Sequence, residues 1–318
     1  MWAKQKQPGF TIVELLIVIV VIGILAAITI VAYNGIQSRA KIAASQSAVA
    51  SAAKMLEQYK LNNIQANGGE LYPTDLTAAL ATGIKASSGG TYTNYIANNT
   101  ISPAYYCLTE TNGTTSYSVT STQSTPVEGV CVTNLMQNPS FESNMTSWGG
   151  NTSLTSINAT TGGTGGALGS KRLTIYRTGT GDAYASYPSS AMNAPLNVPI
   201  SLSFWISGDS SFSLNDTILF RHTITGNQHI IATAPTYAVT AAPKQVTLSG
   251  TTNASSSTGP LQIILRLPLA NTVNVYYDGF MMTQTAVPYA FADGNTPGWI
   301  WNGTVNNSTS TGPALPLS

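Results

Sequence analysis

The chain has 318 residues and a formal net charge of +1, and only 8% of its residues are charged. This composition excludes the basic field with which nucleic-acid-binding proteins neutralise phosphates, and the length predicts two or three domains. In the later part of the chain Ser, Thr, Asn and Gly dominate, which favours an exported protein built mainly of strands and loops.

An apolar segment spans residues 10–33, interrupted only by Glu14, two threonines and one glycine. As a helix it would measure roughly 36 Å, which exceeds the thickness of a bilayer core, about 30 Å. Residues 1–9 precede it as a leader with two lysines, and the positive-inside rule places this leader in the cytoplasm. Three interpretations follow: a secretory signal cut after its apolar core, an uncut anchor, or a cut between Gly9 and Phe10 that leaves the helix on the mature protein.

Glu14 favours the third interpretation. A carboxylate inside a membrane-spanning helix costs up to about 3 kcal/mol, so it is usually kept for a partner. A cut before Phe10 would expose an amine that can pair with Glu14 of a neighbouring subunit. The run GFTIVELLIV from Gly9 to Val18 resembles the cleavage and assembly signature of type IV pilins and pseudopilins. The resemblance implies that a prepilin peptidase cuts after Gly9 and methylates Phe10. It also implies that Glu14 sets the register among other pilin subunits, and that an inner-membrane assembly platform builds them into a filament.

The same helix is expected to continue beyond the membrane. Apolar residues recur at helical spacing as far as Tyr59, and Asn62 and Asn63 are typical of a helix end. About fifty residues of helix would form a rod near 80 Å long, of which the second half supports a headpiece.

The headpiece, residues 34–132, is expected to be a small antiparallel sheet. Thr74 is the expected N-cap of a short helix over residues 76–81. Three short strands follow, and Asn112-Gly113 is typical of the hairpin between the last two. We expect these strands at residues 92–97, 105–109 and 116–120.

Cys107 and Cys131 are the two cysteines of the chain. Their number and spacing favour one disulfide formed in an oxidising compartment, and the alternative is two unrelated free thiols. A bridge would close a loop of about 25 residues and contribute about 3 kcal/mol of stability in the chain-entropy model.

The pattern changes at about Asn134. Alternating apolar residues at 200–207 and 261–267 predict strands with one buried face. The runs NLMQNPSFE at 134–142 and VNVYYDGFMM at 273–282 resemble the opening and the close of galactose-binding-like jelly-roll modules. That resemblance implies a carbohydrate-binding type of sandwich. We expect Trp299 and Trp301, in the segment that follows, to pack against it.

The jelly-roll resemblance also implies a structural calcium ion. Glu142 and Asp278 occupy positions where this family often supplies carboxylates, and carbonyls of residues 169–171 would complete the hard oxygen ligands. The alternative is that Glu142 pairs with Lys171 or Arg172 and no metal binds.

A sugar-binding face can be proposed from strand parity. Trp205 stands among serines on the polar side of its strand, and an exposed flat aromatic ring can stack on a pyranose. The alternative is that a loop or a neighbouring domain covers this Trp. By the same parity, hydrogen bonds to sugar hydroxyls would come from Arg221, Gln262, Arg266 and Tyr276.

Catalysis is not expected, because the sequence shows neither a nucleophile motif nor a convincing pair of catalytic carboxylates. The expected fold class is α+β, with a long N-terminal helix and a small antiparallel-sheet pilin headpiece followed by an all-β jelly-roll sandwich. The expected function is a filament subunit that crosses the bacterial cytoplasmic membrane as a precursor and then displays an adhesive sandwich at the cell surface. The alternative is a minor pseudopilin of a type II secretion or DNA-uptake apparatus. The expected domains are a leader at 1–9, an assembly helix at 10–33, the headpiece at 34–132, the sandwich at 133–288 and a C-terminal segment at 289–318.

Overall fold

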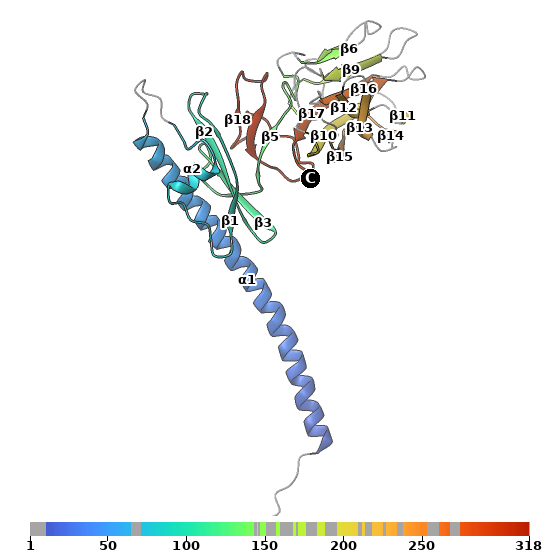
Figure 1. Ribbon diagram of the computed structural model, residues 1–318. Coiled ribbons are helices and arrows are strands. Elements are labelled where there is room, and N and C mark those ends of the chain that lie inside the picture. The colour runs from blue at the N-terminus through green and yellow to red at the C-terminus, as the bar shows by residue number, and fades with distance from the viewer. Residues whose placement is uncertain are drawn as a thin grey trace, which may run out of the picture.

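The computed structural model of the chain combines a long helix, a small sheet beside it and a larger β-sandwich (Figure 1). Gly9 and Phe10, the expected cleavage site, lie outside the described residues. The structure describes residues 11–64, 71–142, 145, 147–150, 157–159, 168–169, 171–175, 183–187, 196–208, 212–213, 218–224, 227–233, 238–252, 261–267 and 274–317.

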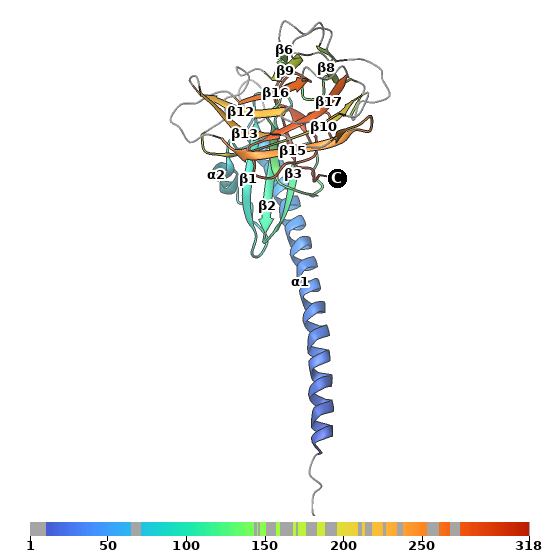
Figure 2. The same ribbon diagram turned by 90° about the vertical axis from the view of Figure 1, so that its right-hand side faces the viewer.

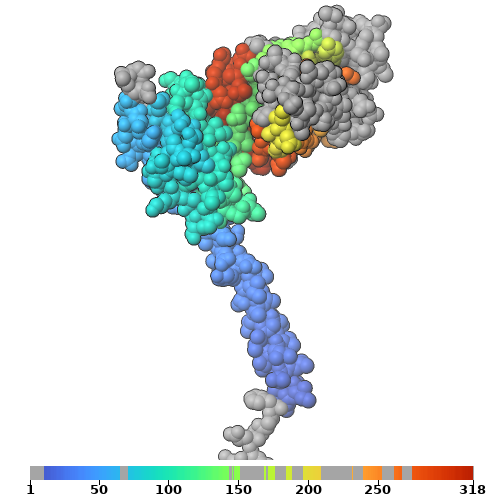
Figure 3. All heavy atoms as spheres, in the orientation of Figure 1, coloured from blue at the N-terminus to red at the C-terminus, as the bar shows by residue number. Residues whose placement is uncertain are grey.

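Helix α1 runs from Ile12 to Asn62 without a break, as the apolar and amphipathic patterns predict. Its first half projects away from the rest of the molecule as a bare rod (Figure 3). Its only buried residues are Ser45, Val49, Ala52, Ala53 and Leu56 in the second half, where the helix packs against the headpiece.

A short helix, α2 (Leu76–Ala81), precedes the headpiece sheet. Its N-cap is Asp75, whose carboxylate accepts the Ala78 N–H at 2.9 Å, so the expectation of Thr74 as the cap is wrong by one position. Thr74 instead donates its hydroxyl to Asp75. The carboxylate directly precedes the first helical residue, where it also interacts favourably with the helix dipole.

The headpiece sheet has the antiparallel order β1-β2-β3-β4, and its strands are β1 (Thr91–Asn98), β2 (Tyr105–Asn112), β3 (Thr115–Thr120) and β4 (Val127–Glu128). The predicted hairpin at Asn112-Gly113 joins β2 to β3. Between this sheet and α1 lies a core that combines small and aliphatic helix residues with tyrosines, among them Tyr72, Tyr95 and Tyr106.

The sandwich consists of two five-stranded antiparallel sheets, which we name by their distance from the headpiece (Figure 2). The proximal sheet has the order β15-β10-β17-β8-β7, and the distal sheet has the order β13-β12-β16-β9-β6. A strand pair, β11 (Phe212–Ser213) and β14 (Ala238–Val239), adjoins them. The bounds are β6 (Gly149–Gly150), β7 (Ile157–Ala159), β8 (Leu173–Ile175), β9 (Ala183–Tyr187), β10 (Pro199–Gly208), β12 (Ile218–Ile224), β13 (Asn227–Thr233), β15 (Lys244–Thr251), β16 (Leu261–Leu267) and β17 (Val275–Thr283).

The predicted alternation defines the sandwich core. Ile200, Leu202, Phe204 and Ile206 of β10 are buried, and they share one core with alternate residues of the opposite sheet. Those residues of β16 are Leu261, Ile263 and Leu265. Each strand therefore turns one row of side chains inward and the other outward.

Residues 284–317, which we call the C-terminal strap, join the sandwich to the headpiece. Strand β19 (Ser310–Pro313) of the strap pairs with β5 (Cys131–Asn134), the segment that connects headpiece and sandwich, and β18 (Ile300–Trp301) completes a three-stranded sheet. We call this three-stranded sheet the joint. Trp299 packs with Val132 of the joint, with Ala314 directly after β19 and with Met281 of the sandwich strand β17. The end of the chain thus lies between the two larger units (Figures 1 and 3).

Candidate functional sites

The start of α1 is held by a reciprocal pair of contacts between Thr11 and Glu14. The Glu14 carboxylate accepts the Thr11 N–H and the Thr11 hydroxyl, each at 2.8 Å, and the Glu14 N–H donates to the Thr11 hydroxyl oxygen at 3.2 Å. This capping box satisfies two N–H groups that the first turn would otherwise leave unpaired. It was not among the expectations, although the pattern Thr-x-x-Glu can be found in the sequence.

The apolar face of α1 has no partner within the described part of the chain. Residues from Ile12 to Ile36 expose roughly half or more of their large apolar side chains. The helix is long and apolar enough to cross a membrane. Glu14 is thus the one carboxylate in an exposed apolar rod.

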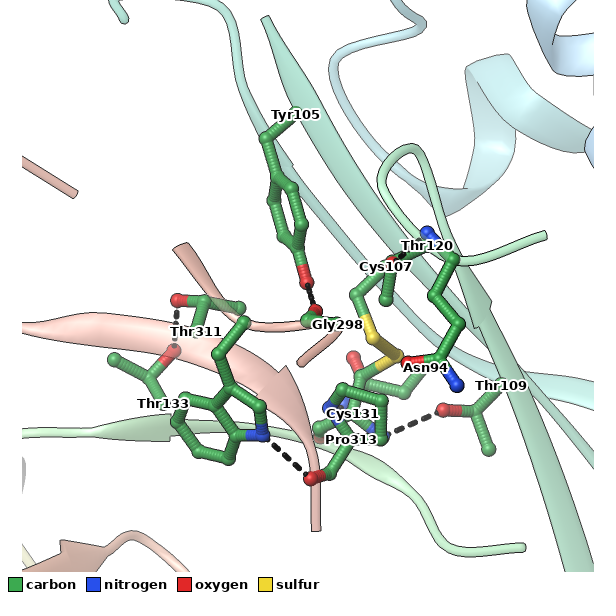
Figure 4. The surroundings of a disulfide bond; sticks show 12 residues. Asn94, Tyr105, Cys107, Thr109, Thr120, Cys131, Thr133, Gly298, Thr311 and Pro313 are labelled. Atoms are coloured by element: carbon green, nitrogen blue, oxygen red, sulfur yellow. Dashed lines mark hydrogen bonds between the residues drawn. A yellow bond between two sulfur atoms is a disulfide. The ribbon is translucent and has the colours of Figure 1, made fainter. Parts of the chain in front are cut away.

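Cys107 and Cys131 form the expected disulfide, with Cα atoms 5.8 Å apart. The bridge joins β2 of the headpiece to β5, and both cysteines are buried. The Cys131 N–H donates to the Thr109 hydroxyl at 2.7 Å, and the Asn94 amide donates to the Cys131 carbonyl at 2.8 Å (Figure 4). The disulfide therefore has a structural role: it attaches the headpiece to β5, the strand with which β19 pairs.

The two expected calcium ligands, Glu142 and Asp278, lie close enough to interact. Asp278 is 2% exposed. Burial raises its pKa to about 7, and the negative charge of Glu142 adds to that increase, while hydrogen bonds from the Leu168 and Gly279 N–H groups oppose it. Those N–H groups donate to the Asp278 carboxylate at 2.9 Å and 2.7 Å.

The loop that contains Gly169 and Lys171 lies against the Glu142 carboxylate. The Lys171 N–H donates to Glu142 at 2.9 Å, so the contact seen from this loop is an amide and not the expected carbonyl. A Cβ atom at Gly169 would lie 2.3 Å from the Glu142 carboxylate, so only glycine allows this close approach. Two adjacent carboxylates from opposite ends of the module, one of them buried, supply hard oxygen atoms, the type of ligand that calcium prefers. Among the described residues no third acidic, His or Cys side chain joins them.

Trp205 does not lie on an open face. The outer row of β10 is covered by the strap: the Ser201 and Ser203 hydroxyls donate to the carbonyls of Val287 and Tyr289. Trp205 itself is half-buried, and a Cβ atom at Gly279 would lie 3.4 Å from the Trp205 ring and 3.3 Å from the ring of Phe291 in the strap. Only about 10 Å³ of space remains beside Trp205, which is room for about one water and not for a sugar.

The residues expected to share a sugar-binding face with Trp205 are divided between two sheets. Tyr276 belongs to β17 of the proximal sheet, where the Arg172 guanidinium lies 3.5 Å from the centre of its ring. Gln262 and Arg266 belong to β16 of the distal sheet. The single expected face is therefore wrong, because strand parity separates inward from outward residues but does not tell which sheet a strand joins.

A groove of about 290 Å³ crosses the outer face of the distal sheet. Gln262 is half-buried and Arg266 is exposed, as their parity predicted. The backbone of Arg221 on β12 pairs with Gln262, which brings the third expected residue to the same strand pair. Sequence reasoning missed Tyr184, which stands opposite Arg266 on β9, although Tyr184 and Ser186 alternate with the buried Ala185 and Tyr187. The lining comprises Tyr184, Ser186, Gln262, Ile264 and Arg266.

Comparisons with known proteins agree with the N-terminal features. Residues 4–30 match the family described as the prokaryotic N-terminal methylation motif. The chain is 34% identical over 93 residues to fimbrial protein EcpC of Eikenella corrodens, a match that covers 29% of this chain and 55% of that protein. It is 33% identical over 60 residues to type II secretion system core protein G of Pseudomonas aeruginosa, covering 19% of this chain and 42% of that protein. The chain thus spans about half the length of the curated relatives that it matches. It carries a prepilin-type methylation motif and is homologous to pilin and pseudopilin proteins.

Solved structures similar to the sandwich are carbohydrate-binding modules. A family 16 carbohydrate-binding module covers 47% of this chain and 99% of its own, with 15% identity and a TM-score of 0.33. The CBM22-2 xylan-binding domain of Paenibacillus barcinonensis Xyn10C covers 48% and 99%, with 15% identity and a TM-score of 0.37. At this degree of similarity, the description of the module as a β-sandwich rests on its own strand pairing.

Proposed function

We propose that this chain is a subunit of a type IV pilus or a related filament, and that its sandwich binds carbohydrate at the cell surface. The filament assignment rests on the exposed apolar surface in the first half of α1 and on Glu14 near the start of that helix. Such a surface is stable in water only when lipid or neighbouring helices cover it.

Maturation is part of the proposal. A prepilin peptidase cuts between Gly9 and Phe10, and the new amine replaces Thr11 as a partner of Glu14, in the same subunit or its neighbour. The precursor resides in the cytoplasmic membrane through α1, and an assembly platform there moves it into the filament. The capping box supports this order of events, because it gives the Glu14 carboxylate an internal partner before cleavage.

The adhesive part of the proposal rests on the groove of the distal sheet. This sheet lies on the side of the sandwich away from the headpiece (Figure 2). In a filament whose core is α1, that face would point outward. A half-exposed tyrosine ring beside amide and guanidinium donors combines a stacking surface with hydrogen bonds, which is what a sugar ring requires. The proposed ligand contacts are Tyr184, Gln262 and Arg266.

We also propose that calcium supports the sandwich without taking part in sugar binding. Glu142 and Asp278 would hold the ion and so tie the opening of the module to its last strand, β17. The raised pKa of Asp278 supports this assignment, because burial and the negative charge of Glu142 outweigh the opposing charge of Arg172.

A second candidate function is a minor pseudopilin in secretion or DNA-uptake machinery. The similarity to a type II secretion core protein favours it, and the same processing and the same use of α1 would apply. The two candidates differ in where the subunit ends up, which is the surface filament in the first and a periplasmic fibre in the second.

Expression of the full chain in a host with a functional pilus system tests the main proposal. Isolated surface filaments should contain the protein, and purified filaments should bind glycans through the sandwich. A Tyr184→Ala variant should assemble normally but lose glycan binding. Protein that stays in the periplasmic fraction would favour the second candidate instead.

A further inference from the structure

We infer that the groove of the distal sheet binds an acidic polysaccharide, that is, a glycan whose sugar rings carry carboxylate or sulfate groups. This inference rests on the proposed carbohydrate-binding function and names the chemical class of the ligand.

The first support is the charge of the distal sheet. Its five strands contain no Asp or Glu in sequence, whereas β12 and β16 each contain one arginine, Arg221 and Arg266. In a chain with 8% charged residues, charge of one sign within these strands favours an anionic ligand.

The second support is the position of Arg266. It is exposed, it lines the groove, and the described lining contains no carboxylate that could neutralise it. A guanidinium presents a planar fork of N–H donors that matches a carboxylate or sulfate with two parallel hydrogen bonds. A neutral sugar hydroxyl uses only one of those donors.

Arg172, beside the proximal sheet, is an arginine of the same module whose charge is balanced by a neighbouring carboxylate. Arg172 lies over the Tyr276 ring at 3.5 Å, and its charge opposes the rise in the pKa of the neighbouring Asp278. That cation serves the internal structure of the sandwich. No described residue that lines the groove places such a carboxylate beside Arg266, so its charge is available to a ligand.

The third support is the neighbour of Arg266 across the strand pair. Tyr184 is its direct partner in the register of β9 and β16. Side chains opposite each other in an antiparallel pair stand about 5 Å apart at Cβ. One sugar ring can therefore stack on the tyrosine while its carboxylate reaches the guanidinium, and Gln262 lies farther along the groove for the next ring.

The test compares two polymers that differ only in charge. Polygalacturonate and the neutral galactan obtained by reducing its carboxylates are titrated against the full-length protein in detergent micelles. We expect polygalacturonate to bind about tenfold more tightly, as for a hydrogen-bonded ion pair, and this preference to shrink as salt is raised. Arg266→Gln should abolish the preference, and Lys85→Gln, which removes an exposed headpiece charge, should keep it.

Each other outcome has a definite meaning. Equal binding of both polymers, lost in Tyr184→Ala, would overturn the acidic-ligand inference and leave carbohydrate binding intact. No binding of either polymer, with none on a panel of other acidic and neutral glycans, would overturn both. A preference that survives in Arg266→Gln, whose thermal unfolding should match that of the parent, would remove this arginine from the site.

Discussion

The hydroxyl of Tyr105 in the headpiece donates a hydrogen bond of 2.9 Å to the carbonyl of Gly298 in the strap, across 193 residues of sequence. Both partners are buried, next to the disulfide (Figure 4). A second bond joins the strap to the segment before β5, because the Ala314 N–H donates to the Val130 carbonyl at 2.7 Å. Within the strap, the Trp299 indole donates to the Pro313 carbonyl at 2.9 Å. The headpiece and the sandwich are therefore held together by the last residues of the chain and not by a simple linker.

Removal of this hydroxyl should destabilise the joint. In Tyr105→Phe the Gly298 carbonyl remains buried without its donor, which costs about 1–3 kcal/mol. Chemical denaturation of the full chain in detergent, followed by tryptophan fluorescence, measures the loss. Tyr59→Phe, on the helix and outside the strap, is the matched control and should have an effect close to zero. Equal stability of both variants would mean that the Tyr105–Gly298 contact contributes nothing.

Loss of the disulfide should lower stability by about 3 kcal/mol, the chain-entropy value for a loop with a sequence separation of 24. The paired variant Cys107→Ser/Cys131→Ser and its parent can be compared by denaturant midpoint. Because β19 pairs with β5 at Cys131, hydrogen exchange should also become faster in residues 310–313. Faster exchange in the headpiece alone would contradict the described role of the strap.

The stability of the metal-free sandwich should depend on pH through Asp278. Its pKa is raised from 3.8 to about 7 in the folded protein, so folding is favoured by the protonated form. This contribution is fully present below the unfolded value and is lost as pH rises through the folded value. With a chelator present, the melting temperature should therefore fall between about pH 4 and about pH 7. Asp278→Asn should flatten that part of the curve, and an unchanged curve would contradict the raised pKa.

Calcium should reverse this loss if Glu142 and Asp278 bind it. At a hundredfold excess over its dissociation constant a ligand adds about 2.7 kcal/mol to stability. Differential scanning calorimetry near pH 8 should show a higher melting temperature with calcium than with chelator, and the difference should vanish in Glu142→Gln. Magnesium, which needs a tighter octahedron of ligands, should have a smaller effect. If calcium leaves the parent unchanged, the calcium assignment is wrong.

Much of the architecture could be predicted because it depends on local pattern. The apolar run with Glu14 predicted the long helix, the alternation of Ile200 to Ile206 predicted a strand with one buried face, and the two cysteines predicted their bridge. In each of these cases the signal lies within a short stretch of sequence, so no knowledge of distant pairing is needed.

The rest depends on pairing between distant segments. The register of β19 with β5 joins residues about 180 positions apart. The sequence of residues 310–313 contains no pattern that predicts this pairing. Trp205 was expected on an open face because its neighbours are serines, but those serines bond to strap carbonyls. Polar residues on a strand can mark a hydrogen-bonded interface as well as a wet surface, and sequence parity does not separate the two.

The most direct test of the central claim is the mass of the N-terminal peptide of the mature protein, isolated from filaments or membranes. We predict that the mature chain begins at Phe10 with a methylated amine, and that Glu14→Leu is processed but fails to assemble. A mature protein that still begins at Met1, or a Glu14→Leu variant that enters filaments as well as the parent, would contradict it.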